Sequence, residues 1–209
     1  DSSTSRGLGD VYKRQLLCGA ASLGAKVKLP ALVGDNMILQ QQTEVKLWGT
    51  AAPEAEVRVT PSWNGQTMTC RADKDGGWTL AVETPAAGYT PYEITFDDGE
   101  KTTLKNILIG EVWLASGQSN MEMPLKGFAG CCIMNGADDI IVSAENKGVR
   151  MFTVPKHQTY ELQTDCKGSW NISSIETAPD FSATAYYFAT SLSLSLIHIS
   201  EPTRRRGIS

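Results

Sequence analysis

Residues 106–124 read N-I-L-I-G-E-V-W-L-A-S-G-Q-S-N-M-E-M-P, and this stretch decides how the fold is interpreted. Residues 107–115 are apolar apart from one glycine and one glutamate, which is typical of a strand covered on both faces. We therefore predict a buried parallel strand here. Small and polar residues follow at 116–120, where the chain can turn and begin a helix. A serine in that turn would be exposed at the carboxyl end of the strand, where open α/β sheets bind ligands and free N–H groups can hold an oxyanion.

The motif G-Q-S-N-M, residues 117–121, resembles the first motif block of the SGNH (GDSL-like) hydrolases. A lone G-x-S tripeptide is common, but further phrases occur here in the order in which the sialate O-acetylesterase family has them. The phrases are L-P-A-L-V-G-D-N-M-I-L-Q (29–40), G-E-V-W-L-A-S-G-Q-S-N-M-E-M-P-L (110–125), V-R-M-F-T-V-P (149–155) and F-S-A-T-A-Y-Y-F-A (181–189). Residues 29 to about 189 therefore resemble the amino-terminal part of a sialate O-acetylesterase.

This resemblance implies a role for each residue of the motif. Ser119 would be the nucleophile, and its backbone N–H would be the first oxyanion donor. The motif neighbours are Gly117, Gln118, Asn120 and Met121. Among them, Gln118 and Asn120 would hold the turn, while Met121 and Met123 would line an acyl pocket or pack beneath it. The resemblance implies neither a metal nor an organic cofactor.

A serine esterase also needs a base, usually a histidine held by a carboxylate. In the resembled family these two residues form a D-x-x-H near the far end of the hydrolase domain, and later blocks supply a glycine and an asparagine as further oxyanion donors. This chain contains no D-x-x-H, and its two histidines are His157 and His198. We interpret His157 as a surface loop residue, because the family places no base there. We therefore expect the chain alone to be inactive.

The two ends of the chain do not match its middle. Residues 1–15 and 193–209, which include His198, resemble translated sequencing-adapter read-through, and we exclude them from fold reasoning; native tails or a flexible tag are the alternative. Residues 16–25, L-L-C-G-A-A-S-L-G-A, look like the tail of a secretory signal. This predicts export of a bacterial protein to the periplasm or the medium.

The charge balance of the middle argues against nucleic acid as a partner. The ends hold 6 of the 19 basic and 3 of the 23 acidic residues, so the rest has 13 basic and 20 acidic residues, a net charge of −7. Such a surface repels phosphate backbones. No apolar run approaches the roughly 18 residues of a membrane span.

Residues 26–109 show short alternating runs separated by turn signals, which predicts an antiparallel β-sandwich. Apolar residues alternate with polar ones at 45–47, 57–59, 78–82 and 92–96. Asn64-Gly65 and Asp98-Gly99 favour tight hairpin turns, and residues 85–88 break the next run. The tryptophans Trp48, Trp63 and Trp78 could stack on sugars, but aromatic residues in a sandwich more often fill its core.

Residues 110–192 carry a different pattern. We predict a loop over the site at 121–136, a short helix at 137–146 ended by Gly148, a strand at 149–154 and a helix at 182–192. Outside the signal-like residues 16–25, the chain has cysteines at Cys70, Cys131, Cys132 and Cys166. Their number permits pairing in an oxidising compartment, but we favour unpaired thiols, and the adjacent pair matches no usual zinc spacing.

Together these observations predict a jelly-roll-like β-sandwich (26–109), followed by a truncated α/β/α SGNH hydrolase domain (110–192). The resemblance implies a carbohydrate O-acetylesterase that removes O-acetyl groups from sialic acids through a serine acyl-enzyme. An acetyl xylan or other polysaccharide acetylesterase is an alternative, since G-Q-S-N-M does not define the sugar. A non-catalytic carbohydrate-binding module formed by residues 26–109 is a second alternative.

Overall fold

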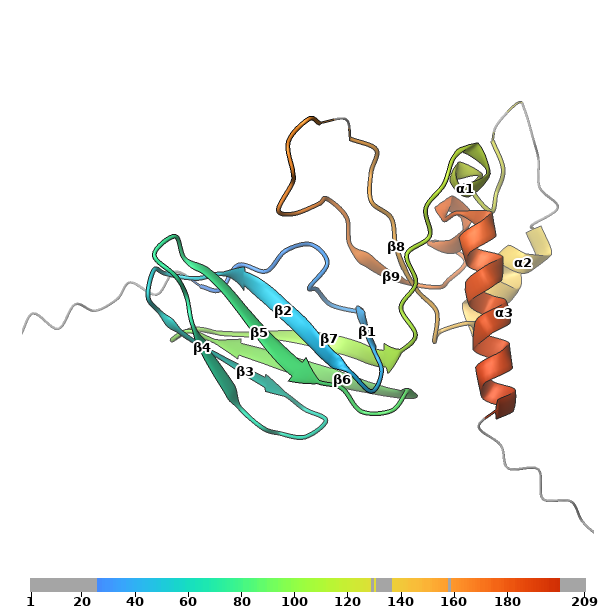
Figure 1. Cartoon of the computed structure of the whole chain (residues 1–209). Coiled ribbons are helices and arrows are strands. Elements are labelled where there is room, and N and C mark those ends of the chain that lie inside the picture. The colour runs from blue at the N-terminus through green and yellow to red at the C-terminus, as the bar shows by residue number, and fades with distance from the viewer. Residues whose placement is uncertain (1–25, 129, 131–136, 158, 200–209) are drawn as a thin grey trace, which may run out of the picture.

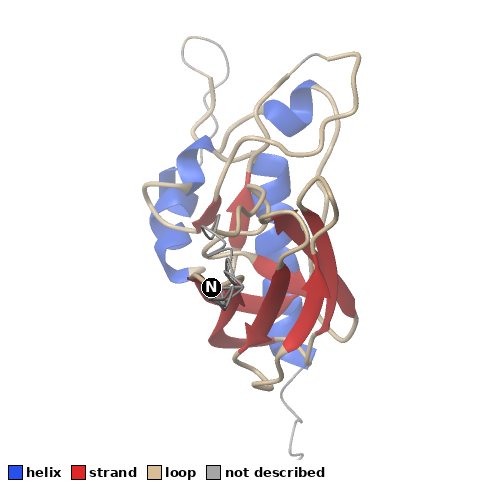
Figure 2. Ribbon diagram, turned by 90° about the vertical axis from the view of Figure 1, so that its left-hand side faces the viewer, coloured by secondary structure: helices blue, strands red, loops and turns tan. Residues whose placement is uncertain are grey.

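A computed structural model of the chain describes residues 26–128, 130, 137–157 and 159–199. Strands make up the first part of the described chain, and helices with one short strand pair make up the part after residue 110 (Figure 1). Figure 2, which views the molecule from the side of the strands, shows the helices behind and beside them. The predicted adapter-like segment 1–15 and the signal-like residues 16–25 lie outside the described residues.

The first part contains two sheets. One has five strands in the order β1-β7-β6-β3-β4, and the other pairs β2 with β5 (Figure 1). Their bounds are β1 Ile38–Gln40, β2 Glu44–Thr50, β3 Glu56–Pro61, β4 Met68–Arg71, β5 Gly77–Glu83, β6 Gly88–Asp97 and β7 Lys101–Gly110. All pairings are antiparallel except that of β1 with β7. The larger sheet is therefore mixed.

Alternation of apolar and polar residues explains how these sheets bury one shared core. In β5 every second side chain is buried, beginning at Trp78, while the residues between point outward. Leu47 of β2, Val57 of β3 and Phe96 of β6 belong to the same core. Each such side chain contributes roughly 1.5–3 kcal/mol when it is removed from water. The predicted strands at 45–47, 57–59, 78–82 and 92–96 all lie within observed strands.

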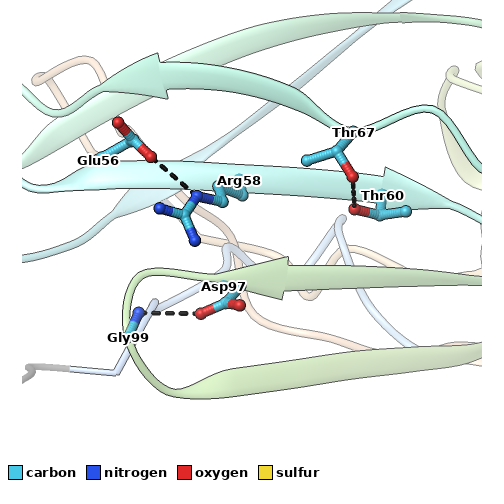
Figure 3. Close-up of polar contacts among 6 residues, drawn as sticks. All are labelled: Glu56, Arg58, Thr60, Thr67, Asp97 and Gly99. Atoms are coloured by element: carbon cyan, nitrogen blue, oxygen red, sulfur yellow. Dashed lines mark hydrogen bonds and ion pairs between the residues drawn. The ribbon is translucent and has the colours of Figure 1, made fainter.

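The predicted turn signals act at their expected places. Gly99 has φ +113° between β6 and β7, and its N–H donates to Asp97 Oδ1 at 3.0 Å (Figure 3). Figure 3 also shows the exposed face of β3, where Arg58 Nε donates to Glu56 Oε1 at 2.8 Å. The Thr60 hydroxyl meets that of Thr67 at 2.8 Å (Figure 3). The Asp97–Gly99 and Thr60–Thr67 contacts fix their hairpins locally, whereas Glu56 and Arg58 lie on the same strand.

The structure corrects the prediction that residues 107–115 form one buried parallel strand. Strand β7 ends at Gly110, pairs antiparallel with β6, and is parallel only to the three residues of β1. Residues 112–118 form no strand and are exposed, with Leu114 at 93%. An extended segment becomes a strand only when a neighbour pairs with its backbone, and the described residues provide none beside 112–118. An apolar pattern cannot reveal that lack.

The second part is built around a smaller core. It contains α1 Ser119–Glu122, α2 Ala137–Val142, η1 Ser143–Glu145, β8 Arg150–Phe152, β9 Trp170–Ile172, η2 Ala178–Asp180 and α3 Ala183–Ile199. Leu125, Met151 and Tyr186 lie in this core. Tyr187 of α3 donates to Asp139 Oδ2 at 2.6 Å, which raises the pKa of Tyr187 to about 12 and ties α3 to α2.

The observed elements agree with the predicted helix at 137–146 and strand at 149–154, although β8 is shorter and its partner β9 was not predicted. Helix α3 covers the predicted 182–192 and continues to Ile199, seven residues into the adapter-like segment. Of the predicted loop at 121–136, residue 129 and residues 131–136 lie outside the described residues. None of the described helices is both long and apolar enough to cross a membrane.

Several contacts join the second part to the first. Trp170 Nε1 donates to the Leu32 carbonyl oxygen at 2.9 Å, and Arg150 donates to Asn106 Oδ1 at 3.1 Å. Gly148 lies against the Tyr89 ring, so closely that a Cβ there would come within 2.5 Å of it. The helices are thus held beside the ends of β6 and β7.

Candidate active site

Hydrogen bonds from two glutamine side chains hold Glu111, the residue directly after β7. We call this contact the clamp on Glu111. Gln41 Nε2 donates to Glu111 Oε1 at 2.6 Å, and Gln40 Nε2 donates to Glu111 Oε2 at 3.1 Å. These bonds, the one from Gln41 first, lower the pKa of Glu111 because they stabilise its charged form. Gln40 Oε1 also accepts from the Val112 N–H at 2.9 Å. The exit direction of the chain from the sheet is therefore fixed by side chains that sequence reasoning missed, although the adjacent glutamines at the end of β1 were a visible signal.

After this clamp the chain runs exposed to the motif. Trp113 is 61% exposed, and its ring meets that of Phe188 on α3 edge to face, with centroids 5.2 Å apart. An apolar hollow of about 430 Å³ opens beside this pair, between the sheet edge and α3. The segment therefore borders a hollow rather than lying inside a sheet.

Ser119 is exposed and is the first residue of α1, a single helical turn. The turn is closed by the Met121 N–H, which donates to the Gln118 carbonyl oxygen at 2.9 Å. Gly117 leaves room for the Met121 side chain, because a Cβ on residue 117 would come within 2.6 Å of Met121 Cγ. Ser119 Oγ has no hydrogen-bond partner among the described residues. Its hydroxyl is thus presented to solvent.

The turn is anchored to the start of α3. Thr184 Oγ1 donates to the Asn120 carbonyl oxygen at 3.1 Å, and the Ala183 N–H donates to the Met123 carbonyl oxygen at 2.8 Å. Gln118 and Asn120 thus take part in the turn through backbone oxygens rather than side chains. Met123 is half-buried, as is Met121. The Thr184 contact had no sequence signal, since it joins residues 64 positions apart.

The loop after β8 approaches α1 from the other side. Lys156 Nζ forms an ion pair with Glu122 Oε2 at 2.7 Å, three residues beyond Ser119. The next residue, His157, is exposed and makes no hydrogen bond or ion pair among the described residues. No described histidine side chain is therefore positioned as a base for Ser119; the side chain of His198 lies outside the described set.

Metal-ligand clusters and cysteines are the other groups that could carry chemistry in this chain. Within the described ranges, no group of three or more His, Cys, Asp or Glu side chains could hold a metal ion. Cys70 and Cys166 are free thiols, and Cys131 and Cys132 lie outside the described residues. Burial raises the pKa of the Cys70 thiol, which makes it less reactive.

Comparison with known proteins shows which proteins this chain is similar to. No protein-family model matches the chain. It is 27% identical over 171 residues to the sialate O-acetylesterase of Rattus norvegicus, covering 75% of this chain and 30% of that protein. It is 28% identical over 160 residues to the sialate O-acetylesterase of Homo sapiens, covering 71% and 29% respectively. The chain is sialate O-acetylesterase-like.

A solved structure supports a hydrolase-like α/β fold for this sialate O-acetylesterase-like chain. The crystal structure of a carbohydrate acetylesterase from Xanthomonas citri matches with a TM-score of 0.73 and 32% identity, covering 81% of this chain and 38% of that one. The chain thus spans less than a third of the length of these curated relatives and well under half of the solved structure. The resemblance first read from the four sequence phrases is confirmed.

Proposed function

We propose that this chain supplies Ser119 as the nucleophile of a carbohydrate O-acetylesterase. The observation that carries the proposal is the exposed hydroxyl of Ser119 at the start of α1, in a turn fixed by Gly117 and by α3, in a chain that resembles sialate O-acetylesterases. A serine without other partners is free to meet a substrate. The finer fold assignment, a jelly-roll-like sandwich followed by part of an SGNH hydrolase domain, belongs to the same proposal.

In the proposed reaction, Ser119 Oγ attacks the carbonyl carbon of an acetyl ester while a base takes its proton. The Oγ–carbon bond forms, the tetrahedral intermediate collapses, and the bond from the acetyl carbon to the sugar oxygen breaks as that oxygen accepts the proton. Water then attacks the acetyl-serine and releases acetate. The Ser119 backbone N–H stabilises the oxyanion in both steps.

The base is the part that the described residues do not supply. We propose that a histidine and its carboxylate come from a D-x-x-H segment of a longer polypeptide, so that the present chain alone is inactive. General-base assistance is typically worth about 10²–10⁴ in rate, and each further oxyanion donor about 10²–10³.

Export, suggested by residues 16–25, is also a proposal, since those residues lie outside the described part of the chain.

O-acetylated sialic acid is the substrate that we propose first, because the sequence relatives are named sialate O-acetylesterases. The structural neighbour is named only a carbohydrate acetylesterase, which favours acetylated xylan or another acetylated polysaccharide as the second candidate. The proposed hydrolysis of either ester uses no metal or organic cofactor, and we propose no nucleic-acid partner.

The test measures release of acetate from an O-acetyl sialic acid and from acetylated xylan. It compares the present chain, a longer protein from the same gene that includes a D-x-x-H, and the Ser119→Ala variant of that longer protein. We expect activity only in the unsubstituted longer protein. Activity in the present chain would refute the proposal that its base is missing, and His157 would then be tested as the base. Full activity of Ser119→Ala would refute the nucleophile, and faster release from xylan would favour the second substrate.

A further inference from the structure

An open hollow of about 720 Å³ lies on the outer face of the β2–β5 sheet. Strands β2 and β5 form its floor, and its walls come from residues 28–30, from residues 71 and 73, and from residues 164 and 165 of the loop after β8. The volume is within the range of about 300–1,000 Å³ that is typical of small-molecule sites. Ser119 is not among its lining residues, so a ligand in this hollow would bind whether or not the proposed esterase function holds.

The floor of the hollow presents an exposed indole. In β2 the alternation buries Leu47 and turns Trp48 outward, where it is 36% exposed. Trp48 pairs with Thr79, and the neighbouring pair on the same face is Thr50 with Gly77, which has no side chain. The Asp73 carboxylate lies over this second pair, because a Cβ on Gly77 would come within 3.0 Å of Asp73 Oδ2. Tryptophan is usually well buried, so an indole exposed on the floor of a hollow is a candidate stacking surface.

The other two tryptophans of this part are already occupied. Trp78 is 4% exposed and packs near Phe96, with ring centroids 5.8 Å apart. Trp63 donates its N–H to the Glu83 carbonyl oxygen and meets Tyr92 edge to face. Stacking by three tryptophans together is therefore excluded. Trp78 also lines the hollow but is almost fully buried, so Trp48 is the one of the three that presents an exposed ring there.

Charged groups on the walls are held in place by the backbone. Asp73 Oδ1 accepts from the Gly77 N–H at 2.7 Å, and Asp165 Oδ1 accepts from the Ala31 N–H at 3.0 Å. Arg71 Nε donates to the Glu54 carbonyl oxygen at 2.9 Å. The second oxygen of each carboxylate and the terminal nitrogens of Arg71 make no hydrogen bond within the described part of the chain. The hollow thus offers both acceptors and donors in fixed positions.

We propose that this hollow binds a neutral saccharide, whose ring stacks on Trp48 and whose hydroxyls reach Asp73, Asp165 and Arg71. A pyranose has an apolar face of C–H groups and an equatorial rim of hydroxyls, each of which donates and accepts. That combination matches an indole flanked by carboxylates and a guanidinium. The carboxylates of Asp73 and Asp165 are balanced by the cations of Lys28 and Arg71, so the lining has no net charge, which favours an uncharged ligand. The site would hold a glycan independently of ester cleavage.

The first experiment maps binding on the unsubstituted chain, with backbone amide resonances followed during titration. The probes are cellotetraose and xylotetraose, which are neutral, and sialyllactose, which is anionic. We expect a dissociation constant on the order of 1 mM for at least one neutral probe, a typical weak affinity. The shifts should centre on residues 48–50 and 77–79. No shift with either neutral probe, shifts confined to other regions, or binding of sialyllactose alone would each overturn the proposal.

The second experiment compares two variants that each remove an exposed tryptophan. Trp48→Ala should weaken binding of the neutral probe about tenfold or more, because it removes the exposed ring on which the saccharide stacks. Trp113→Ala, which removes an exposed tryptophan outside the hollow, should leave the affinity unchanged. Equal losses in both variants, or none in Trp48→Ala, would overturn the assignment. If Trp48→Ala does not fold, the shift map of the unsubstituted chain decides alone.

Discussion

Gly117 and Met121 are in such close contact that a Cβ on residue 117 would lie 2.6 Å from Met121 Cγ. Since real Cβ atoms do not approach a neighbour so closely, any side chain at position 117 must displace the methionine or the turn. The turn presents Ser119, three residues before the end of α1. A glycine and a methionine therefore determine together how the serine is displayed.

Gly117→Ala should accordingly lower the free energy of unfolding by about 1–2 kcal/mol, through overpacking against Met121. The double variant Gly117→Ala/Met121→Ala should recover most of that loss, because the clashing atom is gone. Chemical denaturation of the four proteins of this double-mutant cycle gives the coupling energy. Additive effects of the two substitutions would contradict a direct contact.

The clamp on Glu111 predicts a pH dependence. Hydrogen bonds from Gln41 and Gln40 lower the pKa of Glu111 in the folded chain, so the unfolded chain binds the proton more tightly. The resulting stabilisation is present above the ordinary glutamate pKa, about 4.3, and is lost as the pH falls through the lowered folded value. Between neutral pH and pH 3, the unsubstituted chain should therefore lose more stability than Glu111→Gln.

Denaturation midpoints of both proteins measured across this pH range provide the test. The Gln41→Ala variant is a matched control, since it removes the closer of the two donors and keeps the carboxyl group. Its pH dependence should lie between those of the other two proteins. Parallel curves for the unsubstituted chain and Glu111→Gln would show that the clamp does not affect the titration of Glu111.

Gly49 in β2 lies in close contact with a neighbouring backbone and with a tryptophan ring in the core that the two sheets share. A Cβ there would lie 2.4 Å from the Lys28 carbonyl oxygen and 2.9 Å from the Trp78 ring, neither of which can move without disturbing the sheet. Gly49→Ala should therefore destabilise the chain by about 1–3 kcal/mol. Gly88→Ala is the matched control, because no atom lies within 4 Å of its Cβ position. Its effect should stay within about 0.5 kcal/mol in the same thermal unfolding measurement, and equal effects would refute the packing argument.

The apolar hollow of about 430 Å³ beside Trp113 and Phe188 should bind a hydrophobic fluorescent dye. We expect enhanced dye fluorescence with the folded chain and a marked loss in Trp113→Ser/Phe188→Ser. Leu162→Ser is the control, since Leu162 is also exposed but lies outside the hollow. Dye fluorescence that is unaffected by the double variant, or absent from the unsubstituted chain, would show that this surface is not an accessible apolar site.

The sequence alone identified much of the first part. Alternation of period two located β5 around Trp78 and Leu80, and Asp98-Gly99 marked the hairpin, because side-chain direction and positive φ are local properties of the backbone. The G-Q-S-N-M motif around Ser119 could likewise be recognised from the sequence alone. The domain boundary near residue 109 stays a prediction.

Tertiary structure alone decided which segments find partners. Residues 107–110 pair with β6 and β1. Residues 112–118 have no such neighbour in the part of the chain that the structure describes, although their first half is equally apolar, so one predicted strand became a strand and an exposed connection. The clamp of Gln40 and Gln41 on Glu111 and the bond from Thr184 to Asn120 join residues 64 to 71 positions apart. Secondary-structure propensity and the alternation of apolar residues depend on residues close together in the sequence. Backbone pairing and side-chain contacts depend instead on which distant segments the fold places next to each other.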